Sequence, residues 1–247
     1  MKILGVIPAR YASTRFPGKP LAMIGDKTMI RRVYERSHQC PDLSELVVAT
    51  DDHRIEEHVL AFGGKALMTS PNHRSGTERC REVLDTLGGV KSFDVVINIQ
   101  GDEPYIRTEQ ISLLTGLFND TNVKIGTLIK KISGEEELFN HNVVKVIFDR
   151  NQKAICFSRQ PLPFYRGKPE NEWIKMHDYF KHIGIYGYRS SVLTEITKLE
   201  VSPLEKAESL EQLRWIENGF SIYVRRTNWE SVAIDTPDDL LKLTNTD

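Results

Sequence analysis

Short hydrophobic runs alternate along the first part of the chain with stretches in which hydrophobic side chains recur every three or four positions. The runs cover residues 3–7, 46–49, 66–68 and 95–99, and the helix-period stretches between them include residues 29–34 and 55–62. A run that is hydrophobic at nearly every position predicts a strand covered on both faces. Strands alternating with helices are typical of an open, mostly parallel sheet flanked by helices, which binds ligands beyond the carboxyl ends of its strands.

The second half of the chain is less regular. Residues 124–130, 143–148 and 154–158 are predicted to be strands, and the polar turn at residues 149–152 favours a hairpin of the last two. Residues 160–171 are rich in proline, charge and glycine, so we expect a mobile loop there.

Residues 202–218 predict one capped amphipathic helix. No repeat or linker divides the 247 residues, so we expect a single domain, with a small arm inserted at about residues 140–190. The pattern as a whole predicts an α/β fold: a three-layer arrangement with a mixed, mostly parallel sheet flanked by helices.

Charge and cysteine content narrow the classes of partner. Lys and Arg total 33 against 34 Asp and Glu, and this balance gives no field that would attract nucleic acid or an anionic membrane. Cys40, Cys80 and Cys156 form neither a disulfide framework nor a zinc-ligand spacing, which fits a reducing cytoplasm. The first hydrophobic run ends at Pro8, short of a signal peptide or a membrane span, so we expect no membrane insertion.

Three cations, Arg10, Arg15 and Lys19, lie in a loop at residues 8–20 that follows the first predicted strand. Its prolines keep the loop from becoming a helix. The guanidinium of Arg can bind two phosphate oxygens at once, and the ammonium of Lys acts as a point charge. Gly18 lets the backbone approach a ligand closely. The loop is suited to a nucleoside triphosphate, but a solvated surface loop has the same charge spacing, and the two interpretations both stay open on this evidence.

Familiar nucleotide-binding and hydrolase motifs are absent from the sequence. It has no G-x-G-x-x-G after a strand and no G-x-x-x-x-G-K-[ST], so a dinucleotide-dependent dehydrogenase and a P-loop NTPase both lose support. The serine nucleophile elbow G-x-S-x-G and the zinc helix H-E-x-x-H are absent too.

Two carboxylates follow predicted strands. Asp102 comes after the run at residues 95–99, and Asp235 comes after residues 232–234. Magnesium prefers hard oxygen ligands, usually one or two carboxylates plus substrate phosphates, so the pair suggests a metal site. Each Asp considered alone is more typical of a turn or a helix cap, and residues 235–239 do resemble a helix start with its proline.

Several segments taken together resemble the 3-deoxy-manno-octulosonate cytidylyltransferases, or CMP-KDO synthetases, over nearly the whole chain. The segments are residues 8–20, 49–51, 73–79, 98–104, 182–188, 203–214 and 234–240. Pro-Ala-Arg-Tyr-Ala-Ser-Thr-Arg-Phe-Pro-Gly-Lys-Pro is the most specific match, and Arg-Ser-Gly-Thr-Glu-Arg and Gln-Gly-Asp-Glu-Pro follow in the family's order. The resemblance implies a Rossmann-like nucleotidyltransferase fold, usually a homodimer. It also implies synthesis of CMP-KDO and pyrophosphate from CTP and KDO for lipopolysaccharide, without an organic cofactor.

The resemblance also implies roles for individual residues. Those around the triphosphate are Ala9, Arg10, Arg15 and Lys19, with Arg74 and Ser75 near the ribose and cytosine. Those that bind Mg²⁺ are Asp102, which also lies at the nucleotide, and Asp235. Those around the sugar acid are Gln100, Arg159, His182, Tyr186, Glu211 and Gln212. The catalytic set comprises Arg10, Arg15, Lys19, Asp102 and Asp235.

Several of these residues have a simpler structural interpretation. His182 and Tyr186 lie in an aromatic stretch where a packed, hydrogen-bonded core pair is the commoner finding. Residues 211–212 lie on a predicted amphipathic helix, where a solvated face is expected, and Arg159 could pair with a surface acid. Ser75 with the acid that follows it is a capping pattern, although a helix N-terminus also attracts phosphate or base oxygens.

Competing functions remain open at the level of sequence. A sialic acid cytidylyltransferase is disfavoured by the segments at residues 74–79 and 100–104, but an enzyme acting on 8-amino-KDO is not. A catalytically silent nucleotide-binding regulator is the alternative from another class. Such a protein need not keep the three loop cations and both carboxylates together.

Overall fold

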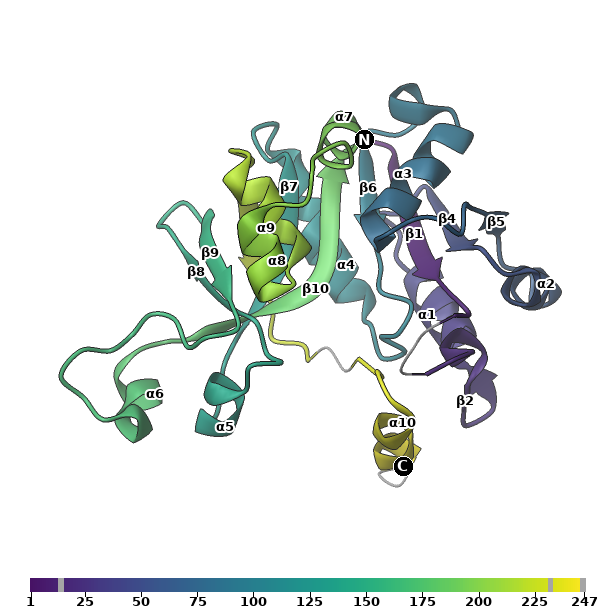
Figure 1. Ribbon diagram of the computed structural model, residues 1–247. Helices are drawn as coiled ribbons and strands as arrows, with labels where there is room; N and C mark the ends of the chain where they lie inside the picture. The colour runs from purple at the N-terminus through teal and green to yellow at the C-terminus, as the bar shows by residue number, and fades with distance from the viewer. Residues whose placement is uncertain (13–15, 231–232, 245–247) are drawn as a thin grey trace.

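The computed structural model describes residues 1–12, 16–230 and 233–244, and is built around a nine-stranded sheet (Figure 1). Its main path runs in the order β11-β7-β10-β6-β1-β4-β5, while β8 pairs with β10 and with β9. The strands are β1 (Ile3–Ala9), β4 (Glu45–Thr50), β5 (Ala66–Met68), β6 (Val95–Asn98), β7 (Ile125–Lys131), β8 (Lys145–Phe148), β9 (Ala154–Ser158), β10 (Phe180–Arg189) and β11 (Ile222–Arg226). A separate hairpin joins β2 (Met23–Ile24) to β3 (Lys27–Thr28).

The sheet is mixed and mostly parallel, as predicted. Strand β1 pairs in parallel with β4 and β6, and β4 pairs in parallel with β5. Strand β10 is antiparallel to both of its neighbours on the main path, β6 and β7, and its register places Tyr186 opposite Asn98. The carboxyl ends of β1, β4 and β6 therefore meet at one edge of the sheet, which the middle of β10 also reaches.

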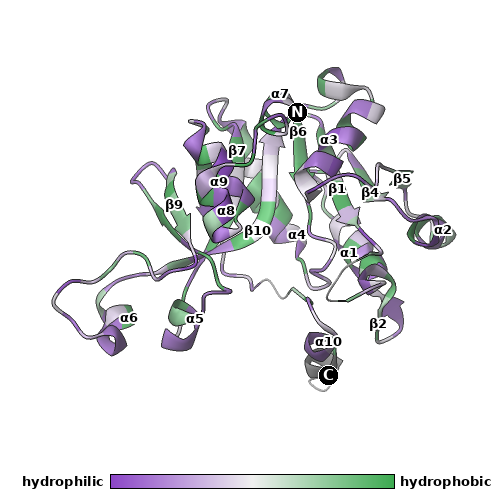
Figure 2. Cartoon of the chain, in the orientation of Figure 1, coloured by the Kyte–Doolittle hydropathy of each residue, from purple (hydrophilic) through white to green (hydrophobic). Residues whose placement is uncertain are grey.

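Helices cover both faces of the sheet. One face carries α1 (Met29–His38), α2 (His53–Ala61) and α4 (Thr108–Thr115), and the other carries α3 (Gly76–Thr86), α7 (Ser190–Ile196), α8 (Pro203–Glu208) and α9 (Glu211–Glu217). Successive residues of a strand point to opposite faces, so Leu4 and Val6 enter one core cluster while Ile3 and Ile7 enter the other. This is why the strand runs are hydrophobic at nearly every position, and Figure 2 shows that character along the central strands.

The remaining elements are short or peripheral. They are α5 (Glu135–Phe139), α6 (Trp173–Met176), α10 (Pro237–Thr244) and the 3-10 turns η1 (Lys19–Leu21), η2 (Gly89–Lys91), η3 (Gly116–Asn119) and η4 (Glu170–Glu172). The antiparallel pair β8–β9 forms the predicted hairpin and projects to one side with α5 and α6 (Figure 1). No helix in the described ranges is long and apolar enough to cross a membrane.

Several elements differ from the sequence-based expectation. The strand expected before Asp235 is not observed, because residues 233–234 have no regular secondary structure, and the last strand of the sheet is β11 instead. The helix predicted at residues 202–218 is broken between α8 and α9, because Ser209 adopts a left-handed conformation with φ 53° and Leu210 is extended. The break turns the Leu210 side chain into the core, where it is 7% exposed. Strand β10, ten residues long, had not been recognised as a strand, because its glycines and its bulge between Ile183 and Tyr186 interrupt the pattern.

Candidate active site

The end of β1 and the segment after β6 are in direct contact at the carboxyl edge of the sheet. A Cβ atom at Gly101 would lie 2.7 Å from the carbonyl oxygen of Pro8, so only glycine permits this approach. Asp102 follows this contact. Its backbone carbonyl accepts a hydrogen bond of 3.0 Å from the amide of Ile234, which brings the segment before α10 to the same edge. Ile234 is buried, and so the neighbouring Asp235 is held beside Asp102.

Lys19 joins these two carboxylates. Its Nζ lies 2.7 Å from Oδ2 of Asp102 and 3.3 Å from Oδ1 of Asp235. The preceding Gly18 has φ 71°, a conformation that favours glycine, and its amide donates to the carbonyl of Tyr11 at 2.8 Å, which closes the loop on itself. We call Lys19, Asp102 and Asp235 the carboxylate cluster; three segments far apart in the sequence build it.

The donor set of the carboxylate cluster fits a magnesium ion. Two carboxylates converge on one cation, the ammonium of Lys19, and hard oxygen donors of this kind bind Mg²⁺ together with substrate phosphates. No group of three His, Cys, Asp or Glu residues in the described ranges could hold a metal by itself. A metal here would therefore need oxygens from a substrate to complete its coordination.

We call residues 8–20 the basic loop, and the structure shows the contacts of some of its other residues. Ala9 ends β1 and is buried, and Arg10 donates through Nη2 to the backbone carbonyl of His73. Arg15 lies outside the described residues. The hydrogen bond from Arg10 links the basic loop to the segment that leads into α3.

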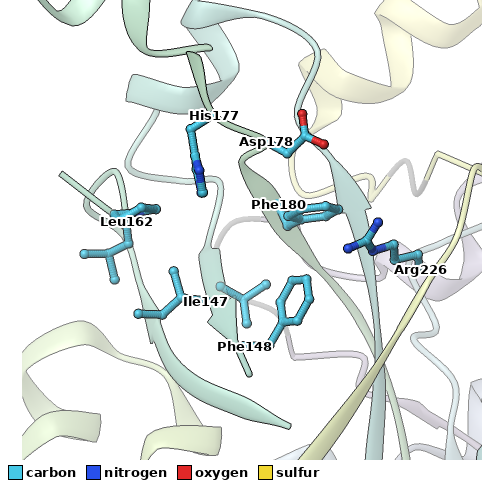
Figure 3. Close-up of a pocket in the computed structure, with 9 residues that line it drawn as sticks. Ile147, Phe148, Leu162, His177, Asp178, Phe180 and Arg226 are labelled. Atoms are coloured by element: carbon cyan, nitrogen blue, oxygen red, sulfur yellow. The ribbon is translucent and has the colours of Figure 1, made fainter. Parts of the chain in front are cut away.

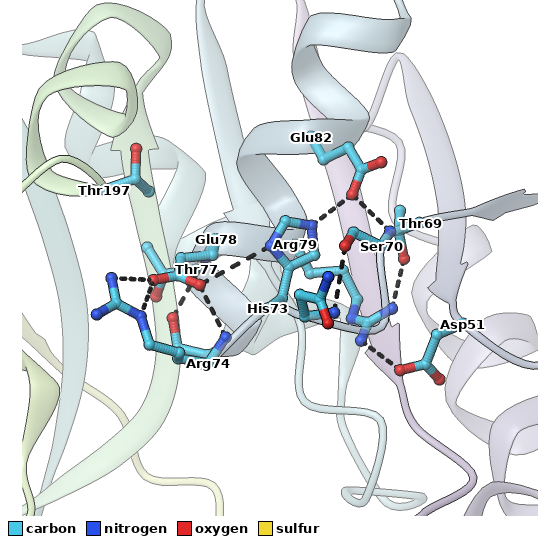
Figure 4. A network of polar contacts seen from close by, with 12 residues as sticks. Asp51, Thr69, Ser70, His73, Arg74, Thr77, Glu78, Arg79, Glu82 and Thr197 are labelled. Carbon is cyan, nitrogen blue, oxygen red and sulfur yellow. Dashed lines mark hydrogen bonds and ion pairs between the residues drawn. The ribbon is translucent and has the colours of Figure 1, made fainter.

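A polar network fixes that segment (Figure 4). Arg79 is fully buried, donates to the hydroxyl of Thr69, and forms an ion pair of 2.8 Å with Asp51 at the end of β4. Arg74 is mostly exposed and pairs with Glu78 at 2.9 Å. The start of α3 is thereby anchored to β4 on one side while Arg74 remains at the surface.

The start of α3 also contacts α9. Ser75 caps α3 by accepting a hydrogen bond from the amide of Glu78, as the capping pattern predicted. Its hydroxyl donates to Oε1 of Glu211 at 2.8 Å, and the hydroxyl of Thr77 donates to Oε2 at 2.7 Å. Burial raises the pKa of Glu211 despite these two hydrogen bonds. Gln212 is buried and Glu211 is half-buried, so the expectation of a solvated face at residues 211–212 is wrong.

The middle of β10 carries the next group of predicted residues. Gln100 donates to the carbonyl of Gly184 at 2.9 Å, which connects the segment after β6 to the bulge of β10. The rings of His182 and Tyr186 contact each other with centroids 5.1 Å apart. The hydroxyl of Tyr186 is buried and has no hydrogen-bond partner among the described residues. The predicted core pair is thus packed, and it encloses one polar atom without a partner among the described residues.

His182 is held neutral. Burial lowers the pKa of His182 to about 3. Its Nε2 is 3.0 Å from the hydroxyl of Thr127, which donates its own proton to the carbonyl of Ile185 at 2.7 Å. We therefore assign the imidazole proton to Nε2. Thr127 is not among the residues predicted from sequence, and its one signal there is that it is a polar residue inside a hydrophobic strand run.

Arg159 follows β9 and is oriented by backbone groups. Its Nε donates to the carbonyl of Glu208 at 2.7 Å, and its Nη1 donates to the carbonyl of His141 at 3.1 Å. The predicted pairing with a surface acid is not observed in the described ranges, since the Glu208 carboxylate accepts from the Arg159 amide instead, at 2.9 Å. Glu208 was not identified from sequence, where it is one acid of a polar helix.

Two pockets flank this part of the molecule. One of 360 Å³ lies in the arm between β8, residues 162–163 and the start of β10, and none of the predicted site residues lines it (Figure 3). The other, of 370 Å³, is bounded by Val144, His182 and Gly184. Only the second pocket is continuous with the predicted residues, so we consider it part of the candidate site.

The chain is similar along its whole length to characterised sequence and structural families. The cytidylyltransferase family model matches residues 4–225. The 3-deoxy-manno-octulosonate cytidylyltransferase of Cytophaga hutchinsonii is 53% identical over 247 residues, covering 100% of this chain and 98% of that one. The protein of the same name from Porphyromonas gingivalis is 47% identical, covering 98% of this chain and 94% of that one.

Solved structures agree with this relationship. A CMP:2-keto-3-deoxy-manno-octonic acid synthetase complexed with CTP is 42% identical, with a TM-score of 0.91 over 100% of this chain and 98% of that one. A 4-diphosphocytidyl-2C-methyl-D-erythritol synthase from Anaerococcus prevotii is 12% identical with a TM-score of 0.64, and shows the common fold alone. The family suggested by the sequence motifs is confirmed: the chain belongs to the cytidylyltransferases, among the 3-deoxy-manno-octulosonate cytidylyltransferases.

Proposed function

We propose that the protein transfers the CMP group of CTP to 3-deoxy-D-manno-octulosonate, giving CMP-KDO and pyrophosphate for lipopolysaccharide synthesis. The observation that carries this proposal is the carboxylate cluster, which brings a lysine and two carboxylates from three segments to the carboxyl edge of the sheet. Identity of about 50% along the full length to enzymes named for this reaction supports it.

The basic loop would hold the triphosphate. Arg10, Arg15 and Lys19 supply positive charge for the phosphate oxygens, and Ala9 brings the backbone of β1 to the nucleotide. Arg74 and Ser75 would lie near the ribose and cytosine. These cations offset the charge that develops on the departing pyrophosphate, and charge stabilisation of this kind is the main catalytic contribution in phosphoryl and nucleotidyl transfer.

Asp102 and Asp235 would hold Mg²⁺ between themselves and the phosphate oxygens. When bound, the ion neutralises charge on the reacting phosphate. The two carboxylates would orient the ion. Lys19 contacts both of them and would bind the same phosphates, which supports this part of the proposal.

The sugar acid would bind between β10, α9 and the arm. Its contacts would come from Gln100, Arg159, His182, Tyr186, Glu211 and Gln212. The 2-hydroxyl attacks the α-phosphate in line, its oxygen forms the new bond to phosphorus, pyrophosphate leaves, and the hydroxyl proton passes to water. The neutral His182 and the unpartnered hydroxyl of Tyr186 suit hydrogen bonds to sugar hydroxyls.

The wider assembly follows the same proposal. We infer one nucleotidyltransferase domain over residues 1–247, with the arm inserted at about residues 140–190 and joined to the sheet through the pairing of β8 with β10. We also infer a homodimer that works in the cytoplasm, in keeping with the free thiols of its cysteines and the use of CTP.

Pyrophosphate release tests the function directly. CTP, UTP and ATP are each combined with KDO, 8-amino-KDO and sialic acid, with and without Mg²⁺. We expect release only with CTP, KDO and Mg²⁺ together. Faster turnover of 8-amino-KDO or sialic acid would reassign the substrate, and CTP binding by calorimetry without any release would favour a nucleotide-binding regulator.

A further inference from the structure

Lys145, on β8, is a fully buried lysine that the proposed mechanism leaves unexplained. Its Nζ donates to the backbone carbonyls of Asn140 at 2.9 Å and Val143 at 2.7 Å. No carboxylate in the described ranges lies within ion-pair distance of it. Burying an ammonium without a counter-ion costs desolvation free energy, so Lys145 lowers the stability of the fold unless its charge has another role.

The carbonyls that Lys145 holds belong to the segment between α5 and β8, which also orients Arg159. His141, inside this segment, presents its carbonyl to Nη1 of Arg159 at 3.1 Å. Asn142 and Val143 line the 370 Å³ pocket together with His182. Lys145 therefore fixes both a wall of that pocket and one of the two carbonyls that aim the guanidinium.

The other carbonyl is fixed from the opposite side of the hairpin. Ser158 lies directly across from Lys145 in the β8–β9 register and donates to Oε1 of Glu208 at 2.6 Å. The amide of Arg159 donates to Oε2 of the same carboxylate at 2.9 Å. The backbone carbonyl of Glu208 in turn accepts a hydrogen bond from Nε of Arg159. We call Lys145, Arg159 and Glu208 the arm cluster.

The arm cluster leaves the charge of Arg159 available. Both hydrogen bonds from its guanidinium go to backbone carbonyls, and no side-chain carboxylate pairs with it within the described part of the chain. A guanidinium oriented by neutral acceptors keeps its positive charge for an anionic ligand. The basic loop is proposed to hold the triphosphate of CTP, so the anion that remains for Arg159 is the carboxylate of the sugar acid.

We propose that Lys145 is a positioning residue for the sugar acid: by holding residues 140–143, it aims Arg159 at the substrate carboxylate. The inference rests on the proposed function. It predicts that loss of Lys145 weakens sugar-acid binding while leaving the nucleotide site intact, because the carboxylate cluster shares no residue with the arm cluster.

Lys145→Met tests the inference, since it keeps the length of the side chain and removes the charge and the donors. We expect the KM for KDO to rise about tenfold, as for a lost charge-assisted hydrogen bond, with kcat and the KM for CTP within about twofold. Lys153→Met, at an exposed position of the same hairpin, is the control and should change none of the three.

A double-mutant cycle with Arg159→Met separates positioning from general stabilisation. If Lys145 acts through Arg159, the double variant should show the KM for KDO of Arg159→Met alone. Additive effects, an equal rise in the KM for CTP, or an unchanged KM for KDO in a folded Lys145→Met protein would each overturn the inference. Wild-type turnover of KDO tests the proposed function separately.

The wild-type protein supplies a test that does not depend on a folded variant. Burial lowers the pKa of Lys145 to about 8, with Glu208 of α8 and Arg159 as its charged neighbours, while Lys181, next to it on β10, pairs with Glu137 and Glu230. The KM for KDO should rise about fivefold between pH 7 and pH 10 as the ammonium is lost, because the neutral amine makes weaker hydrogen bonds to the two carbonyls. A KM that stays constant over this range would contradict the inference.

Discussion

The carboxylate cluster and the arm cluster hold their cations in opposite ways. Lys19 is neutralised by two carboxylates, whose side chains are 25% and 41% exposed, whereas Lys145 and Arg159 donate to backbone carbonyls. Ion pairs that water can reach are exchanged readily for a metal or a phosphate. A cation held by carbonyls stays oriented and keeps its charge. The comparison suggests that the nucleotide side of the site rearranges on binding, whereas the sugar-acid side is already arranged.

The largest effect is expected in the carboxylate cluster. Asp102→Asn removes a charge that would hold Mg²⁺, so kcat should fall by about a hundredfold or more, as for other lost electrostatic stabilisers. Steady-state pyrophosphate release at saturating Mg²⁺ measures it, and Asp235→Asn should behave alike. Asp26→Asn is the control, because the Asp26 side chain is 78% exposed and pairs with Arg32. Near-normal turnover in both cluster variants would remove the metal assignment.

A smaller and more selective effect is expected at Arg159. Arg159→Met should raise the KM for KDO by about thirtyfold, since hydrogen bonds to a charged group contribute about 2 kcal/mol. The KM for CTP should stay within about twofold. Arg166→Met changes an exposed arginine of the same arm and should have no effect. A matching rise in the KM for CTP would mean that the two clusters are not independent.

Acid should destabilise the protein through His182. Its pKa, lowered by burial to about 3 in the folded state, lies below the unfolded value of about 6.5, so the unfolded chain binds more protons between these values. Stability should therefore fall by about 1.4 kcal/mol for each unit of pH below about 6. Urea unfolding at pH 6, 5 and 4 measures it. His182→Gln should lose much of this slope, while His53→Gln, an exposed control, should keep it.

The smallest effect is expected where the two sides meet. Glu211 accepts hydrogen bonds from Ser75 and Thr77, so it joins the nucleotide side to the sugar-acid side. Glu211→Gln keeps the shape and removes the charge, and it should raise the KM for both substrates by about threefold. If only the KM for KDO changes, the contact with α3 has no part in nucleotide binding.

Much of the fold followed from local patterns. The runs that form β1, β4, β5 and β6 were recognisable because their side chains pack against a hydrophobic core on both faces of the sheet. The cap at Ser75 and the start of α10 at Pro237 were also recognisable, because capping depends on residues within one turn. Strand β10 and the break at Ser209 were not, because burial of distant partners overrode the local pattern.

The sequence by itself determined the layers of the fold, the family, and which polar residues are candidates for the active site. Only the tertiary structure decided how those residues meet. Lys19 and Asp235 are separated by 216 positions, and Ser75 and Glu211 by 136. The burial of Lys145 depends on three strands and a loop that no local periodicity brings together. Residue type and spacing fix local conformation and chemistry, but the charge that each group keeps is set by neighbours that the chain supplies from far away.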